Sequence, residues 1–237
     1  DTLEEDRPNY FLFNIQEYDL DNISEYLQRE AALNLEFTPL IRGRLLSAKR
    51  SNSNQLSSEN FMEREANLTW SEPLPKSNSI SKGKWWSKQD TKPEVSVDRE
   101  VAESMNLNIG DELLFSAGGS NFSATVTSFR EIEWESFSPN FFFILSPSLG
   151  KTLPNSYITS IKIPSDMNIM NKFTQQFPTI SSVDLGAIIL QIRNTISSAS
   201  LAVQYIFLLT LIAGILALVA SIFSNRDQRE KETAIMH

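Results

Sequence analysis

The side chains that most often carry out catalysis or bind metals are almost absent from this sequence. It contains no cysteine, and its one histidine is the final residue, His237. A Ser-His-Asp or Cys-His arrangement needs a histidine that neighbouring elements can position, so neither is expected. Zinc sites rely on cysteine and histidine ligands, so none is expected either. We predict no catalytic residues, no cofactor-binding residues, no metal site and no cofactor.

One short motif resembles part of a nucleotide-binding loop. Gly150-Lys151-Thr152 matches the end of the phosphate-binding loop. The first glycine of that motif would fall on Leu145, however, and Pro147 would lie inside the loop. We therefore predict that this stretch does not bind phosphate.

Carboxylates and aromatic residues are plentiful, but their contexts are those of ordinary strands. Glu133 and Glu135 flank Trp134, a pattern typical of a solvated strand face. The aromatic runs at 85–86 and 141–143 could contact a hydrophobic ligand, but packing in a core or an interface is the favoured interpretation. These residues do not indicate an enzyme.

Residues 205–223, near the C-terminal end, carry no charge. At about 1.5 Å per residue, a helix of this length spans roughly 28 Å, close to the thickness of the hydrocarbon core of a bilayer. Its polar side chains Thr210 and Ser221 can bond to their own helix. A buried helix of a soluble protein would normally carry a polar face, so we predict a transmembrane helix.

The charges that flank this segment predict its orientation. Basic residues cluster at 226–231, whereas residues 183–202 contain only Arg193. Lysine and arginine concentrate on the cytoplasmic side of membrane proteins. The tail at 224–237 is therefore expected in the cytoplasm, and residues 1–204 in the periplasm.

The composition favours a bacterial inner-membrane protein. A cysteine-free exported domain suits a bacterial periplasm better than a eukaryotic extracellular domain. The net charge of −8 argues against nucleic acid as a partner. Because the sequence shows no signal peptide at its start, we expect a fragment that follows at least one earlier transmembrane segment.

The exported part is predicted to be an α+β lobe interrupted by a β-rich lobe. The α+β lobe is assigned to residues 1–57 and 139–182, where apolar strands alternate with short helices. The inserted lobe is assigned to 58–138, which contains short strands and the hairpin signal Gly118-Gly119.

Apolar spacing predicts the individual elements of the α+β lobe. Ile23 and Leu27 are four residues apart, as are Phe173 and Phe177, so each pair marks the buried face of a helix. The apolar run at 141–145 predicts a buried strand.

The last helix is predicted to start at a capping box made by Ser181 and Asp184, to form a stalk over 183–204, and to enter the membrane without a break. Its apolar positions have heptad-like spacing and are assigned to an interface with another helix or protomer: Leu185, Ile189, Ile192, Ile196, Ala199 and Val203. Packing of these residues on their own domain is the alternative. Small residues give the membrane segment a packing face: Ala213, Ala217 and Ser221.

Several short stretches occur in a characteristic order along residues 8–232. They are Pro39 with Arg42-Gly43-Arg44, Arg64-Glu65 with Asn67-Leu68-Thr69-Trp70, Val95-Ser96-Val97 leading to Leu107 and Gly110-Asp111, Trp134-Glu135-Ser136, Pro139-Asn140-Phe141-Phe142-Phe143-Ile144, and Phe177-Pro178-Thr179-Ile180 with Asp184-Leu185-Gly186. As an ordered set they resemble the exported domain of MacB/FtsX-like ABC-transporter permeases, most closely the YbbP-type subgroup.

The resemblance implies a porter-like α+β lobe with an inserted β-rich lobe, carried on long stalk helices. It also implies two kinds of partner, a cytoplasmic ABC ATPase subunit and either further permease spans or a second permease protomer. ATPase activity is then expected on the separate subunit, and the stalk would transmit movement across the membrane. The cargo stays open between a lipid-like or hydrophobic substrate and a periplasmic partner protein.

Two other classes of protein stay open. A membrane-anchored periplasmic sensor or binding domain would signal through its last helix to a cytoplasmic kinase or cyclase. A bitopic scaffold of the envelope would have no ATPase partner.

Overall fold

The computed structural model describes residues 8–50, 56–57, 65–88, 90–134, 138–164 and 169–234. The chain divides into two compact units, Asp1–Leu185 and Gly186–His237. The first unit holds the strands and short helices, and the second holds most of one long helix.

Among the described residues, the first unit contains a four-stranded antiparallel sheet with the order β11-β1-β10-β2. Its strands are β1 (Tyr10–Ile15), β2 (Thr38–Lys49), β10 (Ser156–Ile161) and β11 (Ser181–Asp184). Its apolar core includes residues of α1 (Leu20–Ala31) and α4 (Ile169–Gln176). The 3-10 helix η1 (Glu17–Asp19) leads into α1.

A β-bulge in β1 and the spacing within the helices explain this packing. The register of β1 shifts between Leu12 and Ile15, where Asn14 has a φ angle of 63°, and this shift lets both residues face the core. Leu12 and Ile15 of β1 are fully buried against Ile23 and Leu27 of α1 and Phe173 of α4. Burying each such side chain contributes about 1.5–3 kcal/mol relative to exposure in water. The buried helical faces predicted from the apolar spacing are confirmed.

Six strands of the described chain close into a small barrel, in which each strand pairs with two neighbours. The ring runs β2-β4-β9-β6-β8-β7 and returns to β2. The strands not yet located are β4 (Glu65–Trp70), β6 (Glu94–Asp98), β7 (Glu112–Ala117), β8 (Ser120–Ile132) and β9 (Phe143–Leu145). Outside the ring, β5 (Asn78–Gly83) pairs with β8, and β3 (Leu56–Ser57) pairs with β2. Two short helices complete the unit, α2 (Arg99–Ser104) and α3 (Pro147–Gly150).

Apolar side chains from every strand of the ring fill the barrel, including Ile41, Leu68, Val95, Phe115, Val126 and Leu145. Gly118 and Gly119 join β7 to β8 with φ angles of 59° and 81°, a left-handed conformation that favours glycine. The predicted hairpin and the mixed α+β class are confirmed. Closure of the β-rich part into a barrel was not predicted, and the proposed lobe boundaries stay a prediction.

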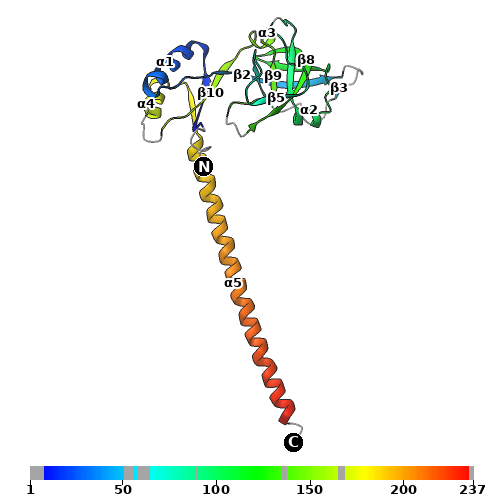
Figure 1. Ribbon diagram of the computed structural model, residues 1–237, viewed down its shortest axis with the longest axis vertical. Helices are drawn as coiled ribbons and strands as arrows, with labels where there is room; N and C mark the ends of the chain where they lie inside the picture. Colours follow the sequence, from blue (N-terminus) through cyan, green and yellow to red (C-terminus); the bar gives the residue numbers. More distant parts are fainter. Residues whose placement is uncertain are drawn as a thin grey trace. The chain divides into compact units, whose positions relative to one another are not determined.

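One strand belongs to both sheets. The first residues of β2, 38–40, pair with β10 of the small sheet, whereas residues 41–49 pair with barrel strands. The small sheet and the barrel are therefore joined by continuous backbone through β2 (Figure 1).

The helix α5 (Leu185–Ala234) is uninterrupted over 50 residues. It does not begin at the predicted capping box, because residues 181–184 form β11 and hydrogen-bond to β1. The predicted start at Ser181 is therefore wrong. Between residues 205 and 218, the large apolar side chains are exposed, from 46% for Ile212 to 70% for Phe207.

Over the described residues, no helix combines the length and the apolar character needed to cross a membrane. The predicted membrane segment at 205–223 lies within α5, but its side chains from residue 219 onward fall outside the described residues.

Candidate functional site

The residues predicted to form the stalk interface all lie on α5, but they are described to different extents. Leu185 is half-buried, and Ile196 and Val203 are 63% and 65% exposed. The side chains of Ile189, Ile192 and Ala199 fall outside the described residues. The interface stays a prediction.

The predicted membrane packing face lies further along α5. Ala213 and Ala217 are exposed, and the side chain of Ser221 falls outside the described residues. This face also stays a prediction.

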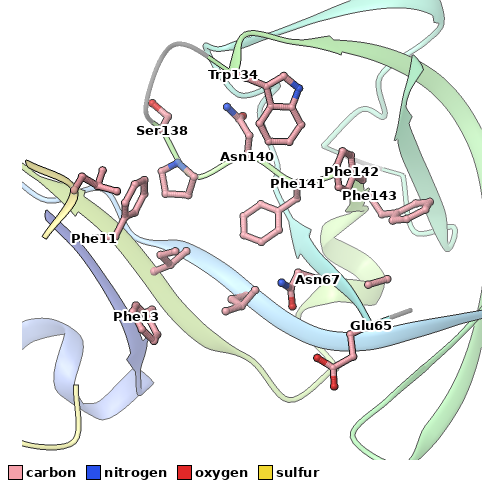
Figure 2. Close-up of a pocket in the computed structure, with 15 residues that line it drawn as sticks. Phe11, Phe13, Glu65, Asn67, Trp134, Ser138, Asn140, Phe141, Phe142 and Phe143 are labelled. Carbon is pink, nitrogen blue, oxygen red and sulfur yellow. The ribbon is translucent and has the colours of Figure 1, made fainter. Parts of the chain in front are cut away.

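The first unit contains a cavity of about 630 Å³ between the small sheet and the barrel (Figure 2). We call it the aromatic groove, because six aromatic side chains line it: Phe11, Phe13, Trp134, Phe141, Phe142 and Phe143. Its volume lies within the range of small-molecule sites, about 300–1,000 Å³. Of these rings, the sequence-based interpretation treated those of Phe141, Phe142 and Phe143 as core or interface residues.

The strand β1 supplies one wall of the groove. Its residues alternate, so Leu12 points into the core beneath the helices while Phe11 and Phe13 point to the opposite face of the sheet. Figure 2 shows both rings on the groove side of β1. Leu185 also lines the groove, and its N–H donates to the carbonyl oxygen of Asn9 at 2.8 Å. The first residue of α5 is thus tied to the residue that precedes β1.

The segment before β9 supplies the other wall. Phe141 and Phe143 are 8% and 5% exposed, whereas Phe142 is 47% exposed. The Phe142 ring lies 5.4 Å from that of Trp134, which is 52% exposed. The core-packing prediction therefore holds for Phe141 and Phe143, and Phe142 forms an exposed aromatic pair with Trp134.

A buried arginine holds this second wall in place. Arg130 of β8 is completely buried, and its Nη2 donates to the carbonyl oxygens of Phe141 at 2.9 Å and Phe142 at 3.1 Å. Its Nε donates to Ser96 Oγ at 3.0 Å, and its Nη1 donates to Asn78 Oδ1. A buried charge is tolerated when such bonds replace its hydration.

The amide of Asn140 extends the same polar network. Its Oδ1 accepts from Ser77 Oγ at 2.9 Å and from Asn78 Nδ2 at 2.9 Å. Since Asn78 also accepts from Arg130, the network fixes the backbone from residue 140 to residue 142.

Burial alters the electrostatics of the arginine. Desolvation lowers the pKa of Arg130 to about 10, and the nearby carboxylate of Asp98 acts in the opposite direction. The guanidinium therefore stays charged at neutral pH and donates through all its bonds.

The other aromatic run, Trp85-Trp86, does not line the groove. The rings lie 3.9 Å apart, and Trp86 is 6% exposed. The two Nε1 atoms donate to the carbonyl oxygens of Glu72 and Ser71 at 3.0 and 2.9 Å. The core-packing prediction is confirmed for Trp86.

No cluster of histidine, cysteine, aspartate and glutamate that could hold a metal occurs among the described residues. Sequence reasoning missed both Arg130 and the aromatic groove. One signal was available for the arginine, a charged residue following the apolar Phe129 within the alternating stretch 121–132. The meeting of β1 with residues 134–143 has no such signal, because it depends on tertiary structure.

The chain is similar to permeases of ABC transporters. The permease is the subunit of such a transporter that is not itself the ATPase. The relative that shows this is the uncharacterized ABC transporter permease YbbP of Escherichia coli (strain K12), with 32% identity over 230 residues. The alignment covers 96% of this chain and 28% of YbbP, so the chain spans just over a quarter of the relative's length. The chain is a homologue of that part of YbbP, as the sequence resemblance predicted.

No protein-family model matches the chain. A crystal structure of a domain of a candidate permease from Porphyromonas gingivalis matches with a TM-score of 0.36 and 8% identity. That match covers 73% of this chain and 85% of the other.

Proposed function

We propose that this chain is the extracytoplasmic domain of an ABC-transporter permease together with the stalk and membrane helix that follow it. The observation that carries this proposal is the identity of 32% to YbbP across 96% of the chain. In the proposed division, residues 1–57 and 139–182 form a porter-like lobe and residues 58–138 an inserted lobe. The porter-like segments also contribute residues 41–49 of β2 and the strand β9 to the barrel.

The properties of α5 support a membrane location. Its 50 residues extend roughly 75 Å at about 1.5 Å per residue. The apolar side chains exposed between 205 and 218 would be unfavourable in water and are suited to lipid. The uncharged sequence continues to residue 223, which completes a bilayer-spanning length. We assign 183–204 to the stalk and 224–237 to the cytoplasm.

In this proposal, a separate cytoplasmic ABC subunit hydrolyses ATP and α5 carries the resulting displacement outward. Leu185 is both the first residue of α5 and part of the groove wall, so displacement of the helix would act directly on the groove. The apolar residues from Leu185 to Val203 and the small residues at 213, 217 and 221 would contact other permease spans or a second protomer.

The aromatic groove supports a hydrophobic cargo. Its walls are mostly aromatic, and the exposed Trp134–Phe142 pair extends this apolar surface outward. Aromatic rings bury large apolar areas on contact with a ligand. We propose that the domain exports or handles hydrophobic or lipid-like molecules.

Thiol labelling tests the proposed topology without background, because the chain has no cysteine. Asn121→Cys lies at the exposed β7–β8 hairpin, and Arg229→Cys follows the proposed membrane segment. In spheroplasts, a membrane-impermeant maleimide should label Asn121→Cys at once and Arg229→Cys only after permeabilisation. Equal labelling of both from one side would overturn the proposal. Co-purification of an ABC ATPase distinguishes the permease from a sensor or a scaffold.

A further inference from the structure

The outer face of β2 carries an apolar residue followed by two arginines. Leu40, Arg42 and Arg44 alternate with the buried residues Ile41 and Gly43, so all three lie on one face of the strand. Leu40 lines the aromatic groove, and both arginines line a smaller adjacent hollow of about 180 Å³. The groove therefore continues along β2 into a cationic surface.

Both arginines are available to a ligand. Their side chains are exposed, and neither forms an ion pair or a hydrogen bond with another residue in the described part of the chain. At strand spacing their Cα atoms lie about 6.6 Å apart. Two guanidinium groups at this separation can contact different oxygens of one tetrahedral anion.

The neighbouring strand β4 completes the surface. Its residues Asn67 and Glu65 lie directly across from Arg42 and Arg44 and are also exposed. Glu65 lines both the aromatic groove and the smaller hollow, so the two are contiguous. Two arginines and one glutamate leave a local charge of +1, which favours an anion. Because the net charge is positive, a dianion gains more Coulomb attraction from this surface than a monoanion does.

We propose that the aromatic groove and the Arg42–Arg44 surface together bind a single-chain amphiphile with a phosphate head group. The alkyl chain lies between Phe11 and Phe141, which Figure 2 shows on opposite walls, and the phosphate contacts the two guanidinium groups. A phosphate monoester carries about −1.5 to −2 charges at pH 7, so it matches this surface better than a carboxylate. This assignment deepens the proposed function by naming a class of hydrophobic cargo.

Bromine quenching of tryptophan fluorescence tests both parts of the site. The complete chain is reconstituted in zwitterionic nanodiscs and titrated with 12-bromododecyl phosphate, with empty nanodiscs correcting for partition into lipid. Of the four tryptophans, Trp134 lines the groove whereas Trp70, Trp85 and Trp86 do not, so Trp134→Phe should remove most of the quenching. The matched probes are 12-bromododecanoate, 12-bromododecanol and 12-bromododecyltrimethylammonium.

We expect the phosphate to bind at least tenfold more tightly than the alcohol or the ammonium, and more tightly than the carboxylate. The double variant Arg42→Gln/Arg44→Gln should reduce phosphate affinity to that of the alcohol. The control Lys49→Gln/Arg50→Gln removes the same charge near the end of β2 and should leave phosphate affinity unchanged. Phe11→Ala should weaken the binding of both the phosphate probe and the alcohol probe.

Equal affinity for phosphate and ammonium, or equal losses in the two charge variants, would overturn the assignment of the head group. Preference for the carboxylate would overturn the choice of phosphate. Unchanged binding in Phe11→Ala would overturn the place of the alkyl chain. The labelling of Asn121→Cys and Arg229→Cys reports topology independently of ligand binding. If the ligand assignment fails, the permease proposal is therefore unaffected, and if the topology proposal fails, the binding results are unaffected.

Discussion

The Nη2 atom of Arg130 lies 2.9 Å from the carbonyl oxygen of Phe141 and 3.1 Å from that of Phe142. These two residues precede β9, which begins at Phe143, so they lie outside its strand ladder. The Asp98 N–H, at 2.8 Å, is a second donor to the Phe142 oxygen. A buried cation of the barrel therefore shapes the wall of the aromatic groove.

Replacing Arg130 by methionine should strongly destabilise the first unit. Arg130→Met keeps an apolar stem but leaves the carbonyl oxygens of Phe141 and Phe142 and the Oδ1 of Asn78 without this donor. We expect the free energy of unfolding to fall by about 3 kcal/mol. For a unit of this size the midpoint of thermal unfolding should fall by roughly 6–12 °C. Near-ultraviolet circular dichroism of the chain in detergent measures it.

Arg99→Met is the control for this prediction. Arg99 is 48% exposed and pairs with Glu103 at 3.9 Å and Glu131 at 3.1 Å. Exposed ion pairs contribute at most about 1 kcal/mol, so a small change is expected. Similar losses in both variants would show that Arg130 does not organise the wall.

Gly150→Ala should disturb the contact between α3 and β4. A Cβ atom at Gly150 would lie 2.1 Å from the Cβ of Trp70, far inside contact distance. Relieving such an overlap typically costs about 1–3 kcal/mol. Gly214→Ala is the control. Among the described residues, no heavy atom lies within 4 Å of a Cβ added at Gly214, so this variant should leave unfolding of the first unit unchanged. Thermal unfolding of the two variants decides this, and equal midpoints would contradict the close packing.

Glu94→Gln should stabilise the protein in a pH-dependent way. Burial raises the pKa of Glu94 above its ordinary value of 4.5, Asp90 raises it further, and Lys92 lowers it. The folded state therefore binds this proton more tightly than the unfolded state, and stability falls as the pH rises through the raised pKa. The variant should unfold at a higher temperature than the wild type at pH 7, and at the same temperature near pH 4.

The exposed residue Glu25 of α1 provides the control. Glu25→Gln removes the same charge from a side chain that is not buried. A pH-dependent difference as large as that of Glu94→Gln would argue against burial as its cause.

Local patterns predicted the elements better than they predicted the groove. The pair Ile23 and Leu27 predicted the helix α1, and Gly118-Gly119 predicted the β7–β8 hairpin. Both predictions were possible because each pattern depends only on residues that are close in the sequence. The capping-box interpretation of Ser181 failed because pairing of β11 with β1 provides hydrogen bonds that no local pattern reveals.

The barrel and the groove depend on contacts between distant parts of the chain. Closure of the barrel requires β2 to pair with both β4 and β7. The groove requires Phe11 to lie near Phe141, which is 130 positions later in the sequence. The apolar character of both phenylalanines was evident from the sequence, but their proximity was not.

If the proposed function holds, a charge placed among the apolar stalk residues of α5 should uncouple ATP hydrolysis from movement of the domain. If the apolar positions of α5 contact another helix, Ile196→Asp buries a charge at that contact and disrupts it. Ser197→Asp introduces the same charge at the next position, about 100° around the helix and off the seam. The side chains of Ile196 and Ser197 are both exposed in this chain, so neither substitution should disturb the fold of the chain that carries it.

The movement that the proposed function requires of the domain can be measured without knowing what is transported. In the assembled transporter, ATP should change the rate at which a maleimide labels Asn121→Cys. Ile196→Asp should abolish this change while ATP hydrolysis continues, because the proposed ATPase is a separate subunit, and Ser197→Asp should preserve it. If both variants retain the ATP-dependent change, the apolar seam of α5 does not transmit the movement, and the domain must be driven through another part of the permease.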